Sequence, residues 1–310
     1  GLSIRTSCPI ELIRLWKTAY GDDMAVGLAE SANRTPPVTV RVNLLKTTSE
    51  DFEKKLKNAG VSFDRHPFLP ACYEIEDAAV LKRLAEIPEN CYYHQDAASQ
   101  LCCMAFGARP GERIADVCAA PGGKSLTIAQ RMENEGEILA GDIHPSKCDA
   151  MERRAKLFGA DMIRTVLRDA SSECPPALIG RFDRVLCDVP CSGLGVIRRK
   201  PEIRYKPLDT FLALPQLQLT ILNQSARMVR NGGVLQYSTC TLNPAENEQV
   251  AERFLSGHPE FSPRILPLDD CFSKLQLQPS HQITLFPPIH GTDGFFIAGF
   301  VKASEAAETR

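Results

Sequence analysis

Two cysteines in this 310-residue chain stand where predicted strands end, and cysteine is a residue type suited to covalent catalysis. Cys191 follows a proline in the segment DVPCSG, and Cys240 closes the apolar segment GGVLQYSTC. A thiolate is a good nucleophile at neutral pH when its surroundings lower its pKa. Methyl transfer to carbon 5 of a pyrimidine needs such a group, because that carbon becomes nucleophilic only after a nucleophile adds at carbon 6. Both cysteines are therefore candidates for covalent catalysis.

A segment with two glycines, DVCAAPGGKS, joins a predicted strand to a predicted helix. Small residues let a ligand approach the backbone, and a helix start offers unpaired N–H groups. Asp142 closes the next strand about 20 residues after Gly122, where a carboxylate binds a ribose in nucleotide-binding sheets. The segment lacks the GxGxxG and GxxxxGK[ST] patterns of diphosphate-binding loops. We therefore expect a nucleoside cofactor with a compact amino-acid tail, such as S-adenosylmethionine, with Asp169 accepting from the adenine amino group.

Composition excludes several classes of protein. The formal net charge of −2 argues against a strongly basic nucleic-acid coat, although local patches can still bind RNA. The 12 cysteines lie in apolar runs without a CxxC pair, which predicts reduced thiols and a cytoplasmic location. The six histidines show no metal-binding spacing, so we expect no metal. No apolar run approaches the ~20 residues of a membrane span, so we expect no membrane contact.

The order of predicted elements indicates how these residues are positioned. Strands are expected at 113–119, 137–143, 163–168, 182–189 and 232–240, and helices at 124–132, 146–158, 208–230 and 244–256. The segments ITLFPPI and GFFIAGFVK suggest a last antiparallel pair. This alternation predicts an α/β fold with a mostly parallel sheet covered on both faces. Ligands in such folds bind beyond the carboxyl ends of the strands, where the three acids Asp142, Asp169 and Asp188 are expected.

The first 92 residues follow a different pattern. Residues 9–33 have helical spacing, the segment 37–43 alternates as a strand, and Ser49 begins an amphipathic helix. Strands at 61–64 and 72–76 and a helix at 77–88 complete a small α+β module of the split βαβ type. We expect a helical segment (1–34), this module (35–92) as an RNA-contacting platform or a lid, and a larger domain (93–305). Because the chain starts at Gly1, we also expect that another domain preceded it.

Longer motifs connect these elements to a known family. The segments RTPPVTVRVN, HQDAASQ, DVCAAPGGKS, DVPCSGLGVIRRKPEIRY, LQYSTCTLNPAENE and GTDGFFIA occur in this order. Together they resemble the NOL/NOP/Sun family of RNA cytosine carbon-5 methyltransferases, most closely its bacterial 16S ribosomal RNA methyltransferase B type. The resemblance covers essentially the whole chain. It implies a class I, Rossmann-like S-adenosylmethionine-dependent methyltransferase sheet with a small N-terminal module similar to an RNA-recognition motif.

The resemblance also implies roles for individual residues. Cys240 would be the nucleophile and Cys191 would assist release of the product, although a proline-cysteine pair alone favours Cys191, as in DNA cytosine methyltransferases. Asp188 would hold the cytosine, and Lys124 would reach the cytosine or the cofactor tail. The cofactor contacts would be Cys118, Ala119, Ala120, Pro121, Gly122, Gly123, Lys124, Asp142, Lys147, Asp169 and Asp188. Lys147 stands where the family usually has arginine, and Val189 where it usually has alanine.

A basic segment, RRKPEIRYK, follows Cys191 and indicates how RNA would be held. Its candidate RNA contacts are Arg198, Arg199, Lys200 and Arg204, because such residues neutralise phosphates and stack on unpaired bases; a solvated basic face is the alternative. We expect a monomer acting on an unpaired cytosine of 16S rRNA, with transfer RNA as the alternative substrate. A non-catalytic ribosome-assembly protein, a small-molecule methyltransferase and a nicotinamide-dependent oxidoreductase fit the two cysteines and the glycine segment less well.

Overall fold

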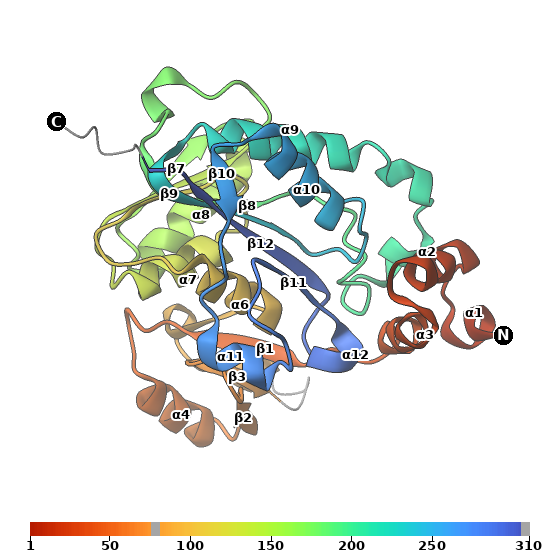
Figure 1. The fold of residues 1–310 in the computed structure, drawn as a ribbon. Helices are drawn as coiled ribbons and strands as arrows, with labels where there is room; N and C mark the ends of the chain where they lie inside the picture. The colour runs from red at the N-terminus through yellow and green to blue at the C-terminus, as the bar shows by residue number, and fades with distance from the viewer. Residues whose placement is uncertain (76–80, 305–310) are drawn as a thin grey trace. The chain divides into compact units, whose positions relative to one another are not determined.

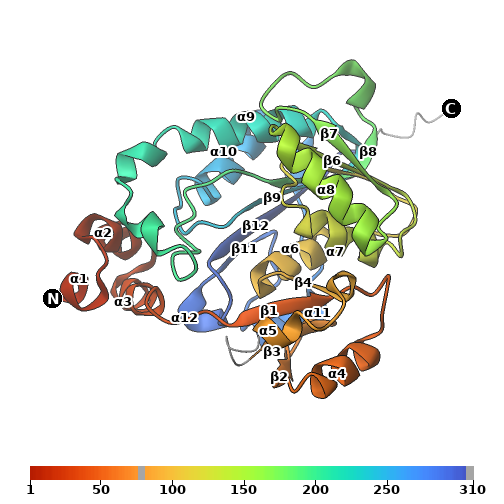
Figure 2. The ribbon, with the colours of Figure 1, turned by 180° about the vertical axis from the view of Figure 1, so that it is seen from behind.

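The computed structural model describes residues 1–75 and 81–304 and divides into two compact units (Figures 1 and 2). The first unit comprises Gly1–Pro36, Ala170–Leu266 and Gln278–Arg310, and the second comprises Pro37–Asp169 and Pro267–Leu277. Within the part of the chain that the structure describes, no helix combines the length and the apolarity that crossing a membrane requires. Each unit holds a different part of the predicted site residues.

The second unit contains three parallel strands in the order β5-β6-β7, with helices between them. The strands are β5 (Arg113–Asp116), β6 (Glu137–Asp142) and β7 (Ile163–Leu167), and α7 (Gly123–Arg131) and α8 (Pro145–Phe158) connect them. Ile114, Ile138 and Ala140 are completely buried, as expected for parallel strands covered on both faces. These strands lie within two or three residues of the predicted ranges.

A small antiparallel sheet in the same unit has the strand order β2-β3-β1-β4. Its strands are β1 (Val38–Val42), β2 (Phe63–Arg65), β3 (Cys72–Ile75) and β4 (Tyr92–His94). Helix α4 (Ser49–Asn58) packs Phe52 against Tyr73 with 5.6 Å between the ring centroids, and the Thr48 side chain caps the helix by accepting from the Asp51 N–H. The predicted helix at 77–88 lies partly outside the described residues, which include α5 (Leu81–Leu84) and the 3-10 turn η2 (Glu89–Cys91).

The first unit is built around two parallel strands, β8 (Phe182–Asp188) and β9 (Val229–Thr239). The antiparallel strand β12 (Phe295–Lys302) pairs with β9, and the short strands β10 (Phe261–Pro263) and β11 (Gln282–Leu285) pair with β12. Helices α9 (Leu214–Ala226) and α10 (Glu248–Gly257) belong to the same unit. The last antiparallel strands agree with the sequence prediction.

Three N-terminal helices of the first unit pack on the loop that follows β8. They are α1 (Leu2–Thr6), α2 (Ile10–Tyr20) and α3 (Asp22–Ser31). Buried Trp16 and Leu28 share a hydrophobic cluster with Leu194 and Ile197 of the loop. Most of the range 9–33 is helical, as predicted, but it forms two helices because the chain turns at Gly21, whose φ of +86° is readily adopted only by glycine.

Several boundaries differ from the sequence predictions for identifiable reasons. Residues 208–211 form a 3-10 turn (η5, Leu208–Phe211) rather than the first turn of a long helix, and α10 begins at Glu248 instead of residue 244. Helix α6 (Ala97–Phe106) was not predicted, although Asp96 caps it by accepting from the Ala98 N–H and Gly107 ends it with a φ of +65°. The remaining short elements are η3 (Pro176–Leu178), η4 (Pro201–Tyr205), α11 (Asp269–Lys274) and α12 (Pro287–His290).

Candidate active site

The glycine segment forms the turn between β5 and α7, as the sequence predicts. Gly122 precedes the helix with a φ of +92°, and no side chain caps the first turn of α7. The Ala119 N–H donates to the Gly141 carbonyl at 2.8 Å, so the turn is held at the end of β6. A Cβ atom at Gly122 would lie 3.2 Å from the Met151 side chain. The result is a tight backbone turn that leads into uncapped helical N–H groups, which suit an anionic ligand group.

A buried amide next to this turn tests whether a cofactor fits there. The Gln95 side chain accepts from the Thr127 hydroxyl at 2.7 Å, which fixes its oxygen and leaves its nitrogen as the free donor. That nitrogen is buried and finds no hydrogen-bond partner among the described residues, and a Cβ on Gly123 would lie 3.6 Å from it. Buried donors are normally satisfied, so this one fits a ligand acceptor such as the carboxylate of an amino-acid tail. Sequence reasoning missed Gln95, although it lies in the motif HQDAASQ.

The two acids predicted to bind the nucleoside lie at the carboxyl ends of adjacent parallel strands. Asp142 ends β6, its side chain is 11% exposed, and its Oδ1 atom accepts from the His144 N–H at 3.0 Å. Asp169 follows β7 and is half-buried. Lys147 is half-exposed, with its Nζ atom 3.9 Å from Asp142 Oδ1, so its ammonium group lies near this acid. The second unit thus brings the glycine turn, Asp142, Lys147 and Asp169 to one end of its parallel strands.

The remaining predicted cofactor and cytosine contacts are divided between the units. Lys124 lies in the first turn of α7 and is half-buried, and Cys118 of the turn is half-buried as well. Asp188 belongs to the first unit, where it ends β8 and its Oδ1 atom accepts from the Ser238 hydroxyl at 2.8 Å. Ser238 lies on β9 opposite Asp188. This hydrogen bond orients the Asp188 carboxylate at the end of the strand.

The two candidate nucleophiles lie close together in the first unit. Cys191 follows β8 and Cys240 follows β9, and both residues are half-buried. Their Sγ atoms are 3.3 Å apart, within hydrogen-bond distance for sulfur. The Gly195 N–H donates to the Cys240 carbonyl at 3.0 Å, which ties the loop after β8 to the end of β9. Two parallel strands therefore place two thiols in direct contact.

The environment of Cys191 favours its neutral form. The hydrogen bond to Cys240, burial, and the negative charges of Cys240 and Glu246 raise the pKa of the Cys191 thiol well above its ordinary value. Where two thiols share a hydrogen bond, one can be ionised while the other donates its proton. Either thiol can donate this hydrogen bond, so the roles expected for these two residues, Cys240 as the nucleophile and Cys191 in product release, stay predictions.

The carboxylate of Glu246 is completely buried and binds residues near the two cysteines. It was not identified from the sequence. Glu246 accepts hydrogen bonds from four groups: the Ser192 N–H, the Ser192 hydroxyl, the Gln218 amide and the Asn243 amide. The only sequence signal was its place in the motif LNPAENE. No local pattern distinguishes this acid from an exposed one, because its donors come from three separate segments.

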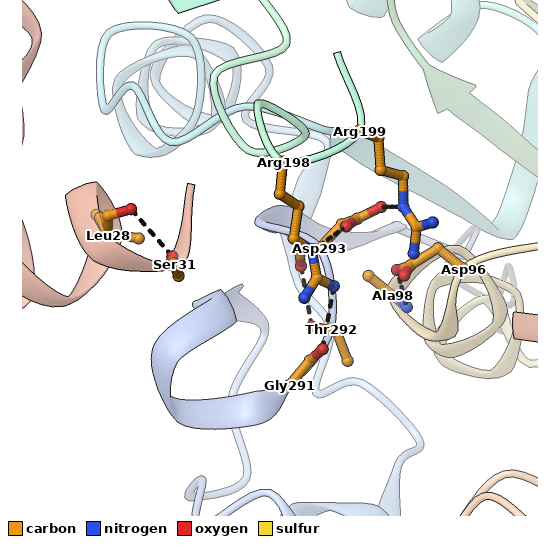
Figure 3. A network of polar contacts seen from close by, with 9 residues as sticks. All are labelled: Leu28, Ser31, Asp96, Ala98, Arg198, Arg199, Gly291, Thr292 and Asp293. Carbon is orange, nitrogen blue, oxygen red and sulfur yellow. Dashed lines mark hydrogen bonds and ion pairs between the residues drawn. The ribbon is translucent and has the colours of Figure 1, made fainter. Parts of the chain in front are cut away.

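The basic segment is arranged differently from the sequence expectation. Arg198 Nε lies 2.8 Å from Asp293 Oδ1 and Arg199 Nε lies 2.6 Å from Asp293 Oδ2, so one buried acid holds both guanidinium groups (Figure 3). Arg198 also donates to the Gly291 carbonyl. The Arg198 side chain is 8% exposed, and that of Arg199 is 30% exposed. Lys200 is exposed.

Arg204 is buried, which corrects the expectation that it contacts RNA. Its guanidinium donates to the Thr6 carbonyl, the Asn33 side chain and the Ala32 carbonyl at 3.1, 2.7 and 2.7 Å. These partners lie in or just after the N-terminal helices. We therefore assign Arg204 to the packing of α1 and α3 against the loop after β8, in place of the RNA contact that the sequence suggested.

Among the described residues, no group of three or more histidine, cysteine or acidic side chains is arranged to hold a metal ion. None of the 12 cysteines, all of which the structure describes, forms a disulfide. The first unit offers two adjacent thiols and the strand-end carboxylate of Asp188, and the second offers two strand-end carboxylates and a backbone turn with uncapped N–H groups.

Comparisons with known proteins show which proteins the chain is similar to. Residues 103–301 match a family model described as 16S rRNA methyltransferase RsmB/F, and residues 9–81 match the ferredoxin-like domain of the same kind of methyltransferase. The probable ribosomal RNA small subunit methyltransferase B of Bacillus subtilis is 33% identical over an aligned length of 310 residues. The alignment covers 97% of this chain and 68% of the relative.

Solved structures share the fold. The structure named PH0851 has a TM-score of 0.86 and 29% identity, covering 97% of this chain and 67% of that chain. NSun6 from Pyrococcus horikoshii, solved with SFG, has a TM-score of 0.81 at 22% identity, covering 96% of this chain and 99% of that chain. These matches confirm the predicted methyltransferase sheet and the small N-terminal module.

Proposed function

The chain belongs to the 16S rRNA methyltransferase RsmB/F family, whose methyl donor is S-adenosylmethionine, and from this premise we propose that it methylates carbon 5 of a cytosine in 16S rRNA. The observation that carries the carbon-5 chemistry is the contact of two thiols, with 3.3 Å between the Sγ atoms of Cys191 and Cys240. A methyltransferase that acts on an oxygen or a nitrogen needs no thiol nucleophile, because the substrate atom itself attacks the methyl group.

In the proposed mechanism, the Cys240 thiolate attacks carbon 6 of an unpaired cytosine. A bond forms between sulfur and carbon 6, and carbon 5 gains the electron density it needs to accept a methyl group. Asp188, oriented by Ser238, holds the cytosine by accepting from its amino group. S-adenosylmethionine, held by the glycine turn and the strand-end acids, would supply the electrophilic methyl group, its sulfonium becoming a neutral thioether. The target base must leave its stack to reach Cys240, which favours an unpaired or locally opened RNA segment.

Release of the product requires removal of the carbon 5 proton and cleavage of the bond between carbon 6 and sulfur. We assign this step to Cys191 as a proton relay: its sulfur accepts the carbon 5 proton while its own proton passes to the Cys240 sulfur, the bond between carbon 6 and sulfur breaks and the double bond between carbons 5 and 6 forms again. The raised pKa of Cys191 supports this division of roles. Loss of that proton from Cys240 to solvent restores the thiolate for the next turnover, so the cycle consumes no residue of the protein.

The cofactor is proposed to bind at the glycine turn of the second unit. The tail carboxylate would meet the uncapped N–H groups of α7 and the Gln95 amide, Asp142 would accept from the ribose hydroxyls, and Asp169 would accept from the adenine amino group. The other residues assigned to this site from the sequence are Cys118, Ala119, Ala120, Pro121, Gly123, Lys124, Lys147 and Asp188. The Lys147 ammonium, 3.9 Å from Asp142, adds a positive charge near the ribose acid.

Replacing Asp142 by alanine is expected to weaken S-adenosylmethionine binding by about 10- to 100-fold, since a hydrogen bond to a charged group contributes about 1.5–3 kcal/mol. Isothermal titration calorimetry measures the affinity directly. Asp149→Ala, an exposed acid on α8, is the matched control and is expected to keep the affinity of the wild-type protein. Equal affinities for Asp142→Ala and Asp149→Ala would remove Asp142 from the cofactor site.

RNA is proposed to contact the exposed part of the basic segment and the small antiparallel sheet. Lys200 is exposed, and Arg199 keeps part of its guanidinium accessible while it pairs with Asp293. The match of residues 9–81 to a ferredoxin-like domain of RNA methyltransferases supports a role of the module at 35–92 in RNA binding. We further propose that the protein acts as a monomer in the cytoplasm and needs no metal.

The function is tested by incubating the protein with labelled S-adenosylmethionine and three RNAs: unmodified 16S rRNA, unmodified transfer RNA and an unrelated RNA. Label in 5-methylcytosine of 16S rRNA is the expected result. Label in transfer RNA alone would identify the alternative substrate, and cofactor binding without transfer to any of the RNAs would favour an assembly protein without catalytic activity.

A further inference from the structure

Glu246 is buried, and within residues 1–75 and 81–304 none of its hydrogen-bond partners is an arginine, lysine or histidine. Four donors converge on its two oxygens, with distances of 2.9 Å to the Ser192 nitrogen, the Gln218 amide and the Asn243 amide. The Ser192 hydroxyl is the fourth donor. Burying a carboxylate is costly unless donors surround it, and here four donors do. Glu246 therefore places an acidic group in the interior, hydrogen-bonded to the residue that follows Cys191, and its negative charge contributes to the raised pKa of the Cys191 thiol.

The same carboxylate joins the two cysteine loops through a directional chain of hydrogen bonds. The Ser192 hydroxyl donates to Glu246 and accepts from the Thr241 hydroxyl at 2.6 Å, and Thr241 in turn accepts from the Leu194 N–H. Ser192 follows Cys191 and Thr241 follows Cys240. The neighbour of each cysteine is thus fixed relative to the neighbour of the other, which holds the two Sγ atoms in contact.

A second link runs through Gln218 of α9. Its amide nitrogen donates to the Pro190 carbonyl at 3.0 Å and to Glu246 at 2.9 Å. Pro190 precedes Cys191, so the residues on both sides of Cys191 are tied to the same carboxylate. On the other side, the Thr241 hydroxyl connects the residue after Cys240 to Glu246 through the Ser192 hydroxyl. The carboxylate of Glu246 is therefore linked to both neighbours of Cys191.

We propose that Glu246 is a positioning residue for the two-cysteine reaction: its carboxylate holds Cys191 against Cys240, and its charge determines which of the two thiols keeps its proton. This inference rests on the proposed function, in which Cys240 must be the thiolate and Cys191 the neutral partner. A negative charge next to Cys191 opposes its ionisation, because two like charges in a poorly hydrated interior repel each other. The proton is thereby retained on the thiol that must assist product release.

The test is alkylation of the free protein, which requires neither RNA nor cofactor. Cys191 and Cys240 are alkylated with iodoacetamide over a range of pH, and peptide mass spectrometry follows each residue separately. Only the thiolate reacts. Glu246→Gln removes the charge with little change in volume, so Cys191 is expected to react at a lower pH than in the wild-type protein. Glu248→Gln, which removes the next acid along the chain, is the control and leaves the Cys191 profile unchanged.

Gln218→Met separates positioning from charge. It removes the link between Pro190 and Glu246 but keeps the carboxylate, so disulfide formation between Cys191 and Cys240 with the oxidant diamide is expected to slow. In this reaction the two thiols are oxidised and diamide is reduced to the hydrazine. The pH profile of Cys191 alkylation should stay at its wild-type position. This variant also keeps the proposal testable if Glu246→Gln does not fold.

In the methyl-transfer assay, Glu246→Gln is expected to lower kcat by about 100-fold, because a small misplacement of a reacting group has an effect of this size. The KM for RNA is expected to change little. If the pH profile of Cys191 alkylation is unchanged in folded Glu246→Gln, the role of the charge is overturned. If the rate of disulfide formation between Cys191 and Cys240 is unchanged in Gln218→Met, the positioning role is overturned. Because alkylation is measured without RNA, neither result depends on whether 16S rRNA is the substrate.

Discussion

Cys240→Ala is expected to abolish methyl transfer to RNA, with a loss on the order of 10⁴-fold or more, as for other enzymes that lose their nucleophile. Without the bond to carbon 6, carbon 5 of cytosine is not nucleophilic enough to accept the methyl group. The assay is the transfer of label from S-adenosylmethionine to unmodified 16S rRNA. Cofactor affinity, measured by calorimetry, is expected to stay at the wild-type value.

Cys174→Ala is the matched control for this variant. Cys174 is a buried free thiol of the same unit, in the segment before η3, and the mechanism gives it no role. Its replacement should leave kcat near the wild-type value. If Cys240→Ala retained kcat within about tenfold, a difference of only about 1.4 kcal/mol in barrier, Cys240 would not be the nucleophile.

Cys191→Ala is expected to leave the addition and methylation steps intact and to block release of the product. The variant should therefore methylate close to one RNA per protein and then stop, whereas the wild-type protein turns over. A rapid-quench time course with enzyme at a known concentration distinguishes a single turnover from slow catalysis. Cys191 is half-buried beside Cys240, so alanine removes the thiol with little change to the surrounding network.

Cys191→Ser provides a graded comparison for this second prediction. A hydroxyl can still donate a hydrogen bond to the Cys240 sulfur, so this variant is expected to release product slowly rather than not at all. Multiple turnovers by Cys191→Ala at the wild-type rate would exclude Cys191 from product release, and a complete loss of the first turnover would assign it an earlier step.

Local sequence patterns were sufficient to predict most of the α/β fold. Buried parallel strands are recognisable in a sequence as continuous apolar runs. Asp142 and Asp188, which were predicted to lie at strand ends, are the last residues of β6 and β8. Helix α6 escaped prediction because its apolar sequence lacks a clear period of 3.6 residues, although its Asp96 cap and its terminal Gly107 were visible. The break at Gly21 was overlooked because helical spacing continues on both sides of it.

The site was harder to predict where its residues depend on distant partners. A run of basic residues suggests an exposed surface, but Arg204 is buried by partners such as Asn33, 171 positions away. Arg198 and Arg199 pair with Asp293, which approaches from the far end of the chain. Glu246 and Gln95 are identified only by their buried hydrogen-bonding atoms. Such pairings arise from tertiary packing, which hydrophobic periodicity does not encode.

The most direct test of the two-cysteine account is a denaturing gel of wild-type protein, Cys240→Ala and Cys191→Ala after incubation with end-labelled 16S rRNA and S-adenosylmethionine. A covalent bond between carbon 6 and a thiol survives denaturation, so the gel shows which cysteine carries the RNA. We predict a protein–RNA band that accumulates with Cys191→Ala and is absent with Cys240→Ala. A band with Cys240→Ala and none with Cys191→Ala would make Cys191 the nucleophile and contradict the account.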